Sequence, residues 1–100
     1  LNFTKFDGLL PAVVQDAQTD KVLMVGFMNA EALEVTRTSG QVTFYSRSKS
    51  RLWTKGEKSG NFLELVAIVS DCDQDTLLIK ANPKGPGVHP RRSSVLHRTY

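Results

Sequence analysis

Three acidic residues alternate with the single cysteine of the chain in "SDCDQD", residues 70–75, directly after the apolar run "FLELVAIV". In an extended segment, Asp71, Asp73 and Asp75 project to one side, whereas Cys72 projects to the other. Carboxylates gathered in this way are ligands for a hard cation such as Mg²⁺, and a thiolate prefers a softer metal. The spacing therefore indicates a magnesium site, with Cys72 facing a second, softer metal.

Two other interpretations of this acidic segment start from the same residues. An EF-hand calcium loop begins with the same alternation, but its sixth position is Thr76 instead of Gly and its twelfth is Asn82 instead of Glu, which argues against that loop. A turn rich in Asp that caps strand ends and solubilises a sheet edge needs no metal. This structural interpretation stays open beside metal binding.

A second segment with chemical potential is "SRSKSRLWTKGEKSGN", residues 46–61, which surrounds the only tryptophan, Trp53, with basic side chains. Basic groups, hydroxyls and exposed backbone N–H groups bind phosphate, and an indole can stack on a purine or a ribose edge. A phosphorylated nucleotide is therefore a natural ligand for this loop. The alternative is a solvated, charged hairpin whose Trp53 packs on the core. The basic residues are Arg47, Lys49, Arg51, Lys55 and Lys58.

The elements that position these segments are short strands and one helix. A helix is expected after Asn29, an N-cap residue, and before the stop signal Gly40, with Ala32, Leu33 and Thr36 on one face. Two strands around a polar turn suggest a hairpin, and the rest of the chain from Asn82 onward has no periodicity. We expect strands at 12–17, 22–28, 41–48, 61–69 and 76–81. The fold class is therefore α+β, a small strand-rich domain with one helix.

Composition sets the remaining limits. One hundred residues at 40% hydrophobic suit a single domain, residues 1–100, of a size that often gains stability by dimerising. One cysteine forms no internal disulfide, and no segment resembles a signal peptide or a membrane span. We therefore expect a cytoplasmic protein. A net charge of +3 permits an anionic ligand without indicating a nucleic-acid surface.

The stretches "LLPAVVQDAQTDKVLMVGFMNAEAL", "TFYSRSKSRLWTKGEKSGN" and "SDCDQDTLLIKANPKGP", in this order, closely resemble the phosphoribosyl-AMP cyclohydrolase family of histidine biosynthesis. The resemblance runs from about Asp7 to Pro86. Its most specific parts are "SRS..RLW.KGE.SGN" and "DCD.D". In some organisms this domain stands alone, and in others it is the N-terminal half of a fusion with a phosphoribosyl-ATP pyrophosphatase.

The resemblance implies a metal-dependent hydrolase that opens the N1–C6 bond of the adenine ring of phosphoribosyl-AMP. By this likeness Asp71, Asp73 and Asp75 bind Mg²⁺, Cys72 binds zinc, and His89 is the catalytic histidine. Zinc lowers the pKa of a bound water, so that a hydroxide attacks C6. The resemblance also implies an intertwined homodimer with active sites that draw on both chains. We assign the ribose 5-phosphate and the ring to Arg47, Arg51, Trp53, Lys55 and Ser59 as a hypothesis.

Residues 87–100 depart from the family pattern. The family has two further zinc cysteines, contributed by the partner subunit, where this chain has Val88 and Val95. Valine has no lone pair, and one thiolate does not normally hold zinc. Three explanations stay open: an impaired relative, a site in which His89 and His97 supply nitrogen ligands, or a natural tail that differs from this one.

A second class of function keeps the basic loop without turnover. Such a protein is a nucleotide-phosphate binding module, which retains ligand affinity when Cys72 is removed. A third class, single-stranded nucleic-acid binding, is disfavoured because one aromatic residue, Trp53, offers little stacking surface. Steep salt dependence of oligonucleotide binding would be needed to support it.

Overall fold

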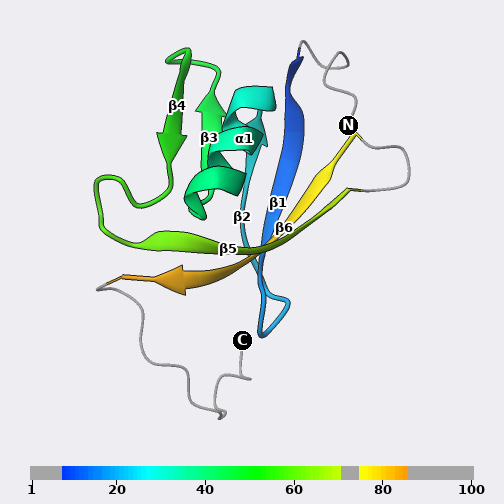
Figure 1. The fold of residues 1–100 in the computed structure, drawn as a ribbon, viewed down its shortest axis with the longest axis vertical. Coiled ribbons are helices and arrows are strands. Elements are labelled where there is room, and N and C mark those ends of the chain that lie inside the picture. Colours follow the sequence, from blue (N-terminus) through cyan, green and yellow to red (C-terminus); the bar gives the residue numbers. More distant parts are fainter. Residues whose placement is uncertain (1–7, 71–74, 86–100) are drawn as a thin grey trace.

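A computed structural model of the chain describes residues 8–70 and 75–85. These residues form six strands and one helix (Figure 1), which confirms the expected α+β class. In chain order the elements are β1 (Leu10–Asp16), β2 (Val22–Met28), α1 (Ala30–Ser39), β3 (Thr43–Ser46), β4 (Arg51–Thr54), β5 (Phe62–Ser70) and β6 (Leu77–Lys84).

The strands form two sheets. The larger sheet has the order β2-β1-β6-β5, and the smaller one is the β3–β4 hairpin. Within the larger sheet β1 pairs in parallel with β6, whereas the β1–β2 and β5–β6 pairs are antiparallel. The helix α1 lies against β3 and β2 (Figure 1). The hairpin and the helix therefore belong to one layer, and the four-stranded sheet forms the other.

Alternation along the strands places the core between these layers. In β1 the residues Leu10, Ala12 and Val14 are buried, and the residues between them are half-buried, as expected for a strand with one covered face. The core is completed by Met28, Ala32, Leu33, Val42, Phe44, Leu63, Leu77, Ile79 and Ala81.

The opposite face of the large sheet carries apolar side chains that no other described element covers. One row crosses all four strands through the paired residues Val25, Val13, Leu78 and Val69. Val25 is 58% exposed and Val69 is 47% exposed. An exposed apolar row of this kind is typical of a surface that contacts another molecule.

The helix ends follow the sequence signals. The side chain of Asn29 accepts a hydrogen bond from Ala32 N at 2.7 Å, which satisfies one free donor of the first turn. Gly40 adopts φ 78°, a left-handed conformation, and its N–H donates to Thr36 O. The expected inward residues Ala32 and Thr36 are buried.

No helix in the described part of the chain is long and apolar enough to span a membrane.

Two expectations about strands were wrong. The basic segment contains a strand, β4, because Phe44 pairs with Trp53 across the hairpin. The strand β6 also continues past Asn82 to Lys84, although aperiodic chain was expected there. Beyond Ala81, β6 pairs with β5 but no longer with β1 in the described residues. Pro83, which has no backbone N–H, therefore interrupts no hydrogen bonds to a strand on its other side.

Candidate functional site

The β3–β4 hairpin positions Trp53. Its pairing partner Phe44 is fully buried, and the two ring centroids lie 5.1 Å apart at an interplanar angle of 34°. A Cβ added to Gly26 would come within 2.6 Å of the Phe44 ring, so this glycine makes room for the ring. The half-buried indole of Trp53 is thereby anchored on the core and still reaches the surface.

The loop after β4 is compact. Gly60 N donates to Gly56 O at 2.7 Å, and Glu57 N donates to Thr54 O at 3.0 Å. Gly56 adopts φ 96°, and a Cβ there would meet the Asn61 backbone at 2.6 Å, so glycine is required for both conformation and space. The loop therefore presents its side chains from a fixed backbone.

Gly85, at the end of β6, approaches the same loop closely. A Cβ on Gly85 would collide with the carbonyl oxygen of Gly60, and the residue has φ 131°. The end of the last strand therefore lies directly beside the basic loop.

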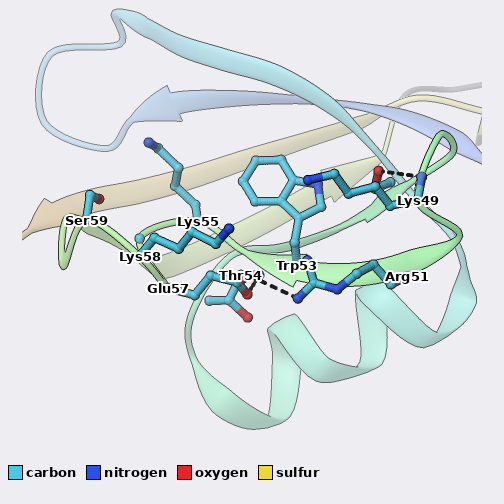
Figure 2. Close-up of a pocket in the computed structure, with 10 residues that line it drawn as sticks. Lys49, Arg51, Trp53, Thr54, Lys55, Glu57, Lys58 and Ser59 are labelled. Carbon is cyan, nitrogen blue, oxygen red and sulfur yellow. Dashed lines mark hydrogen bonds and ion pairs between the residues drawn. The ribbon is translucent and has the colours of Figure 1, made fainter.

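The hairpin and the loop enclose an open hollow of about 460 Å³ (Figure 2). Four basic side chains and one acidic side chain line it, so the lining is strongly positive. In Figure 2 the indole of Trp53 lies between Lys49 on one side and Lys55 and Lys58 on the other. The lining residues are Ser46, Lys49, Arg51, Trp53, Thr54, Lys55, Gly56, Glu57, Lys58 and Ser59.

Glu57 was missed by sequence reasoning. Its Oε1 accepts from Thr54 N at 2.9 Å, and its Oε2 pairs with Arg51 Nη2 at 3.0 Å. These contacts, first the Thr54 N–H and then Arg51, lower the pKa of Glu57 below its ordinary value. The available signal was the spacing Thr-x-x-Glu, in which a carboxylate turns back to the backbone N–H three residues earlier.

Four of the five predicted substrate residues line this hollow, and Arg47 does not. Arg47 lines a neighbouring open hollow of about 650 Å³, which shares Ser46 and Trp53 with the first. Its guanidinium carbon lies 5.5 Å from the ring centroid of Phe27, a cation–π distance. The four residues brought together are Arg51, Trp53, Lys55 and Ser59.

The acidic segment lies at the other end of the β5–β6 ribbon. The basic loop joins β5 at Phe62, whereas Asp75 precedes β6 next to the Ser70 end of β5 (Figure 1). Because β5 has nine residues and a strand rises about 3.3 Å per residue, the two ends are separated by roughly 25 Å. Asp75 is half-buried, and Asp71, Cys72 and Asp73 lie outside the described residues. Within residues 8–70 and 75–85, no three His, Cys, Asp or Glu side chains form a metal-binding group.

Comparison with known proteins decides the family. The model of the phosphoribosyl-AMP cyclohydrolase family matches residues 24–96. The chain belongs to the phosphoribosyl-AMP cyclohydrolase family. The histidine biosynthesis bifunctional protein HisIE of Xanthomonas campestris pv. campestris is 64% identical over 94 residues, which are 94% of this chain and 46% of that protein. The protein of the same name from Escherichia coli (strain K12) is 60% identical over 99 residues, 99% of this chain and 49% of that protein. The chain spans about half the length of the curated relatives it matches.

The cyclohydrolase family match extends over Val88 and Val95, the positions that the resemblance assigns to zinc cysteines. These residues and His89 lie outside the described part of the structure. Cys72 is the only thiol in the chain. The residues of this chain therefore do not fit a zinc site built from three thiolates. Asp71, Asp73 and Asp75 are three oxygen donors at alternate positions, which suit Mg²⁺.

Proposed function

We propose that this chain hydrolyses the N1–C6 bond of the adenine ring of phosphoribosyl-AMP in histidine biosynthesis, as a cytoplasmic hydrolase acting on a cyclic amidine. Membership of the cyclohydrolase family supports this reaction. The structural observation that carries the proposal is the hollow in which four basic side chains surround Trp53. Its volume of about 460 Å³ is in the range of small-molecule sites.

The substrate has two ribose 5-phosphates joined through one adenine ring. We assign one phosphate and its ribose to Arg51, Lys55 and Ser59, and we assign the ring to the indole of Trp53. Arg47 lies in the adjoining hollow that shares Trp53, and we assign the second phosphate to it. Trp53 lines both hollows, and each of them has at least one basic side chain, which suits a ligand with an anion at each end.

Opening the ring requires a water-derived nucleophile at C6 and a group that moves protons. We propose His89 for the proton transfer, because its ordinary pKa lies near neutral pH. Zinc, when bound, supplies a hydroxide at neutral pH. Because Val88 and Val95 provide no ligand, Cys72 would need other donors; His97 is one candidate, and His89 would be a ligand only in place of its role in proton transfer.

The acidic segment is proposed to bind Mg²⁺ through Asp71, Asp73 and Asp75. Carboxylate oxygens are the ligands that this cation prefers, and it keeps several waters or substrate oxygens in its remaining positions. We propose that the bound ion helps to hold the phosphorylated substrate.

We further propose that the chain acts as a homodimer. The basic hollow and the acidic segment are separated by roughly 25 Å along one β5–β6 ribbon, so a site that contains both needs a contribution from a second chain. The exposed apolar row of Val25, Val13, Leu78 and Val69 offers a self-complementary surface for a two-fold contact.

The alternative function is a catalytically impaired relative that binds nucleotide phosphates. Val88 and Val95 favour it, because they remove two thiolates that the resemblance assigns to zinc. Its binding hollow is the same, so binding alone does not separate the two proposals.

The deciding experiment measures zinc per chain in purified, dialysed protein beside a spectroscopic assay of phosphoribosyl-AMP ring opening. An enzyme loses both zinc and turnover on Cys72→Ala, with nucleotide affinity retained. About one zinc per chain with turnover supports the hydrolase. Nucleotide binding without zinc or turnover rejects it and supports the binding module.

A further inference from the structure

One carboxylate lies among the four cations that line the basic hollow. Glu57 shares the lining with Lys49, Arg51, Lys55 and Lys58. A negative charge weakens the positive potential that attracts a phosphate. If Glu57 contacts the ligand, it therefore contacts a group other than the phosphate.

The carboxylate of Glu57 is held in place and kept ionised. Each oxygen accepts one hydrogen bond from the protein, from Thr54 N at 2.9 Å and from Arg51 Nη2 at 3.0 Å. An ionised carboxylate offers about four acceptor positions, so each oxygen keeps capacity for one further donor. The side chain is 32% exposed, which leaves these positions open to a ligand in the hollow.

The groups of a nucleotide differ in what they offer such an acceptor. An ionised phosphate has only acceptors, and the faces of a purine stack on an aromatic ring. The ribose hydroxyls are donors, and the 2′ and 3′ hydroxyls are adjacent, as the two oxygens of a carboxylate are. Hydrogen bonds from hydroxyls to an ionised carboxylate are among the stronger ones in proteins.

We propose that Glu57 is a specificity-determining residue that accepts hydrogen bonds from the ribose hydroxyls of the bound nucleotide and so selects ribonucleotides over deoxyribonucleotides. The proposal rests on the proposed function, because it requires a nucleotide in this hollow. In this arrangement Arg51 has two roles: it holds the carboxylate through one N–H and keeps its other donors for the phosphate.

Equilibrium binding of four mononucleotides tests this assignment. Isothermal titration calorimetry compares AMP with 2′-deoxy-AMP, 3′-deoxy-AMP and IMP, and quenching of Trp53, the only tryptophan, gives a second readout in the hollow itself. Each deoxynucleotide is expected to bind about tenfold more weakly than AMP, because a hydrogen bond to a charged group is lost. IMP, which lacks the 6-amino group, is expected to bind within about twofold of AMP, because hydroxyl contacts are unchanged.

Two variants of Glu57 separate its position from its charge. Glu57→Gln keeps an acceptor for Thr54 N but loses the charge that pairs with Arg51, and Glu57→Asp keeps the charge but withdraws it by one methylene. Both are expected to reduce the preference for AMP over its deoxy forms to about twofold. Lys58→Gln is the matched control in the same loop, since it should weaken all four ligands equally and keep the preference. Thermal melting checks that each variant is folded.

The possible results lead to different conclusions. Equal binding of AMP and both deoxynucleotides by the unmodified protein, or a full preference in both Glu57 variants, overturns the role of Glu57. If IMP binds weakly and the deoxynucleotides bind as well as AMP, Glu57 contacts the base instead of the ribose. That result also overturns the proposal. If AMP does not bind at millimolar concentration, the nucleotide site itself is wrong. A preference for ribose without ring opening keeps the assignment and rejects only the proposed catalysis.

Discussion

Phe44 and Trp53 pair across the β3–β4 hairpin with their ring centroids 5.1 Å apart, one ring fully buried and the other half-buried. This contact joins the hydrophobic core to the basic hollow, since Phe44 belongs to the core cluster and Trp53 lines the hollow. Changes at either ring should therefore affect both the stability of the fold and the binding of ligand.

Trp53→Ala is expected to weaken AMP binding by about tenfold or more, because stacking on an aromatic side chain contributes about 1–3 kcal/mol per base. Trp53→Phe keeps an aromatic face and should retain most of the affinity. Calorimetry measures both variants without relying on tryptophan fluorescence. Equal affinity of Trp53→Ala and the unmodified protein would place the purine elsewhere.

Gly26→Ala is expected to destabilise the fold by about 1–3 kcal/mol, the usual cost of overpacking. The added Cβ would lie 2.6 Å from Phe44 Cδ1 and 2.8 Å from Cε1. Urea unfolding of Gly26→Ala, Phe44→Leu and the double variant measures the coupling between the two positions. The double variant should be less destabilised than the sum of the single ones, and strict additivity would show that the ring is not the obstacle.

Thr36→Val should destabilise the protein by about 1–3 kcal/mol, because it leaves a buried N–H without its acceptor. Thr36 Oγ1 accepts from Thr43 N at 2.9 Å and donates to Ala32 O at 2.9 Å, and the side chain is fully buried. Thr38→Val on the exposed face of α1 removes a comparable bond to Glu34 O and should change stability by about 0.5 kcal/mol or less. Chemical denaturation of both variants compares the buried bond with the exposed one.

Acid should weaken the contribution of Glu57 to stability. Its folded-state pKa is lowered by the Thr54 N–H and by Arg51, so the stabilisation is fully present above the ordinary value and is lost as pH falls through the lowered value. The stability difference between the unmodified protein and Glu57→Gln should therefore shrink in acid. Denaturant unfolding at several pH values measures this difference, and a constant difference across acid and neutral pH would contradict the expected pKa direction.

Val25→Lys is expected to shift the protein toward monomers, since a charge in the apolar row opposes its burial in a dimer. Glu34→Lys, on the exposed side of α1, is the control and should leave assembly unchanged. Sedimentation velocity over a range of protein concentrations measures the state of each variant. A monomer in the unmodified protein at all concentrations would reject the shared site.

The helix and most strands could be predicted because local signals determine them. Asn29 and Gly40 mark the helix ends through their own hydrogen bonds and dihedral angles, and the apolar alternation of β1 needs only one covered face. The strand β4 was missed because it is four residues long and lies in a basic segment, and its formation depends on the pairing of Trp53 with Phe44.

The grouping of the site residues could be predicted only in part. Nearness in sequence correctly grouped Arg51, Trp53, Lys55 and Ser59, because they belong to one hairpin and one loop. It could not separate Arg47, whose position depends on Phe27 of another strand. The metal ligands and the role of His89 stay predictions, since these residues, Asp75 excepted, lie outside the described part.

The contact of Gly85 with Gly60 limits how far the following peptide can travel. His89 is joined to Gly85 by four peptide units, which span at most about 14 Å, and that tether is fixed at the basic end of the ribbon. Cys72 is tethered to Ser70, at the other end, by two units that span about 7 Å. With both tethers fully extended, the Cα atoms of these two residues can come within roughly 4 Å of each other, so a coordination sphere shared within one chain requires both tethers to be nearly extended. Val88→Cys is therefore expected to favour a metal centre between two polypeptides, with metal uptake that rises with protein concentration, and uptake independent of concentration would indicate a site within one chain.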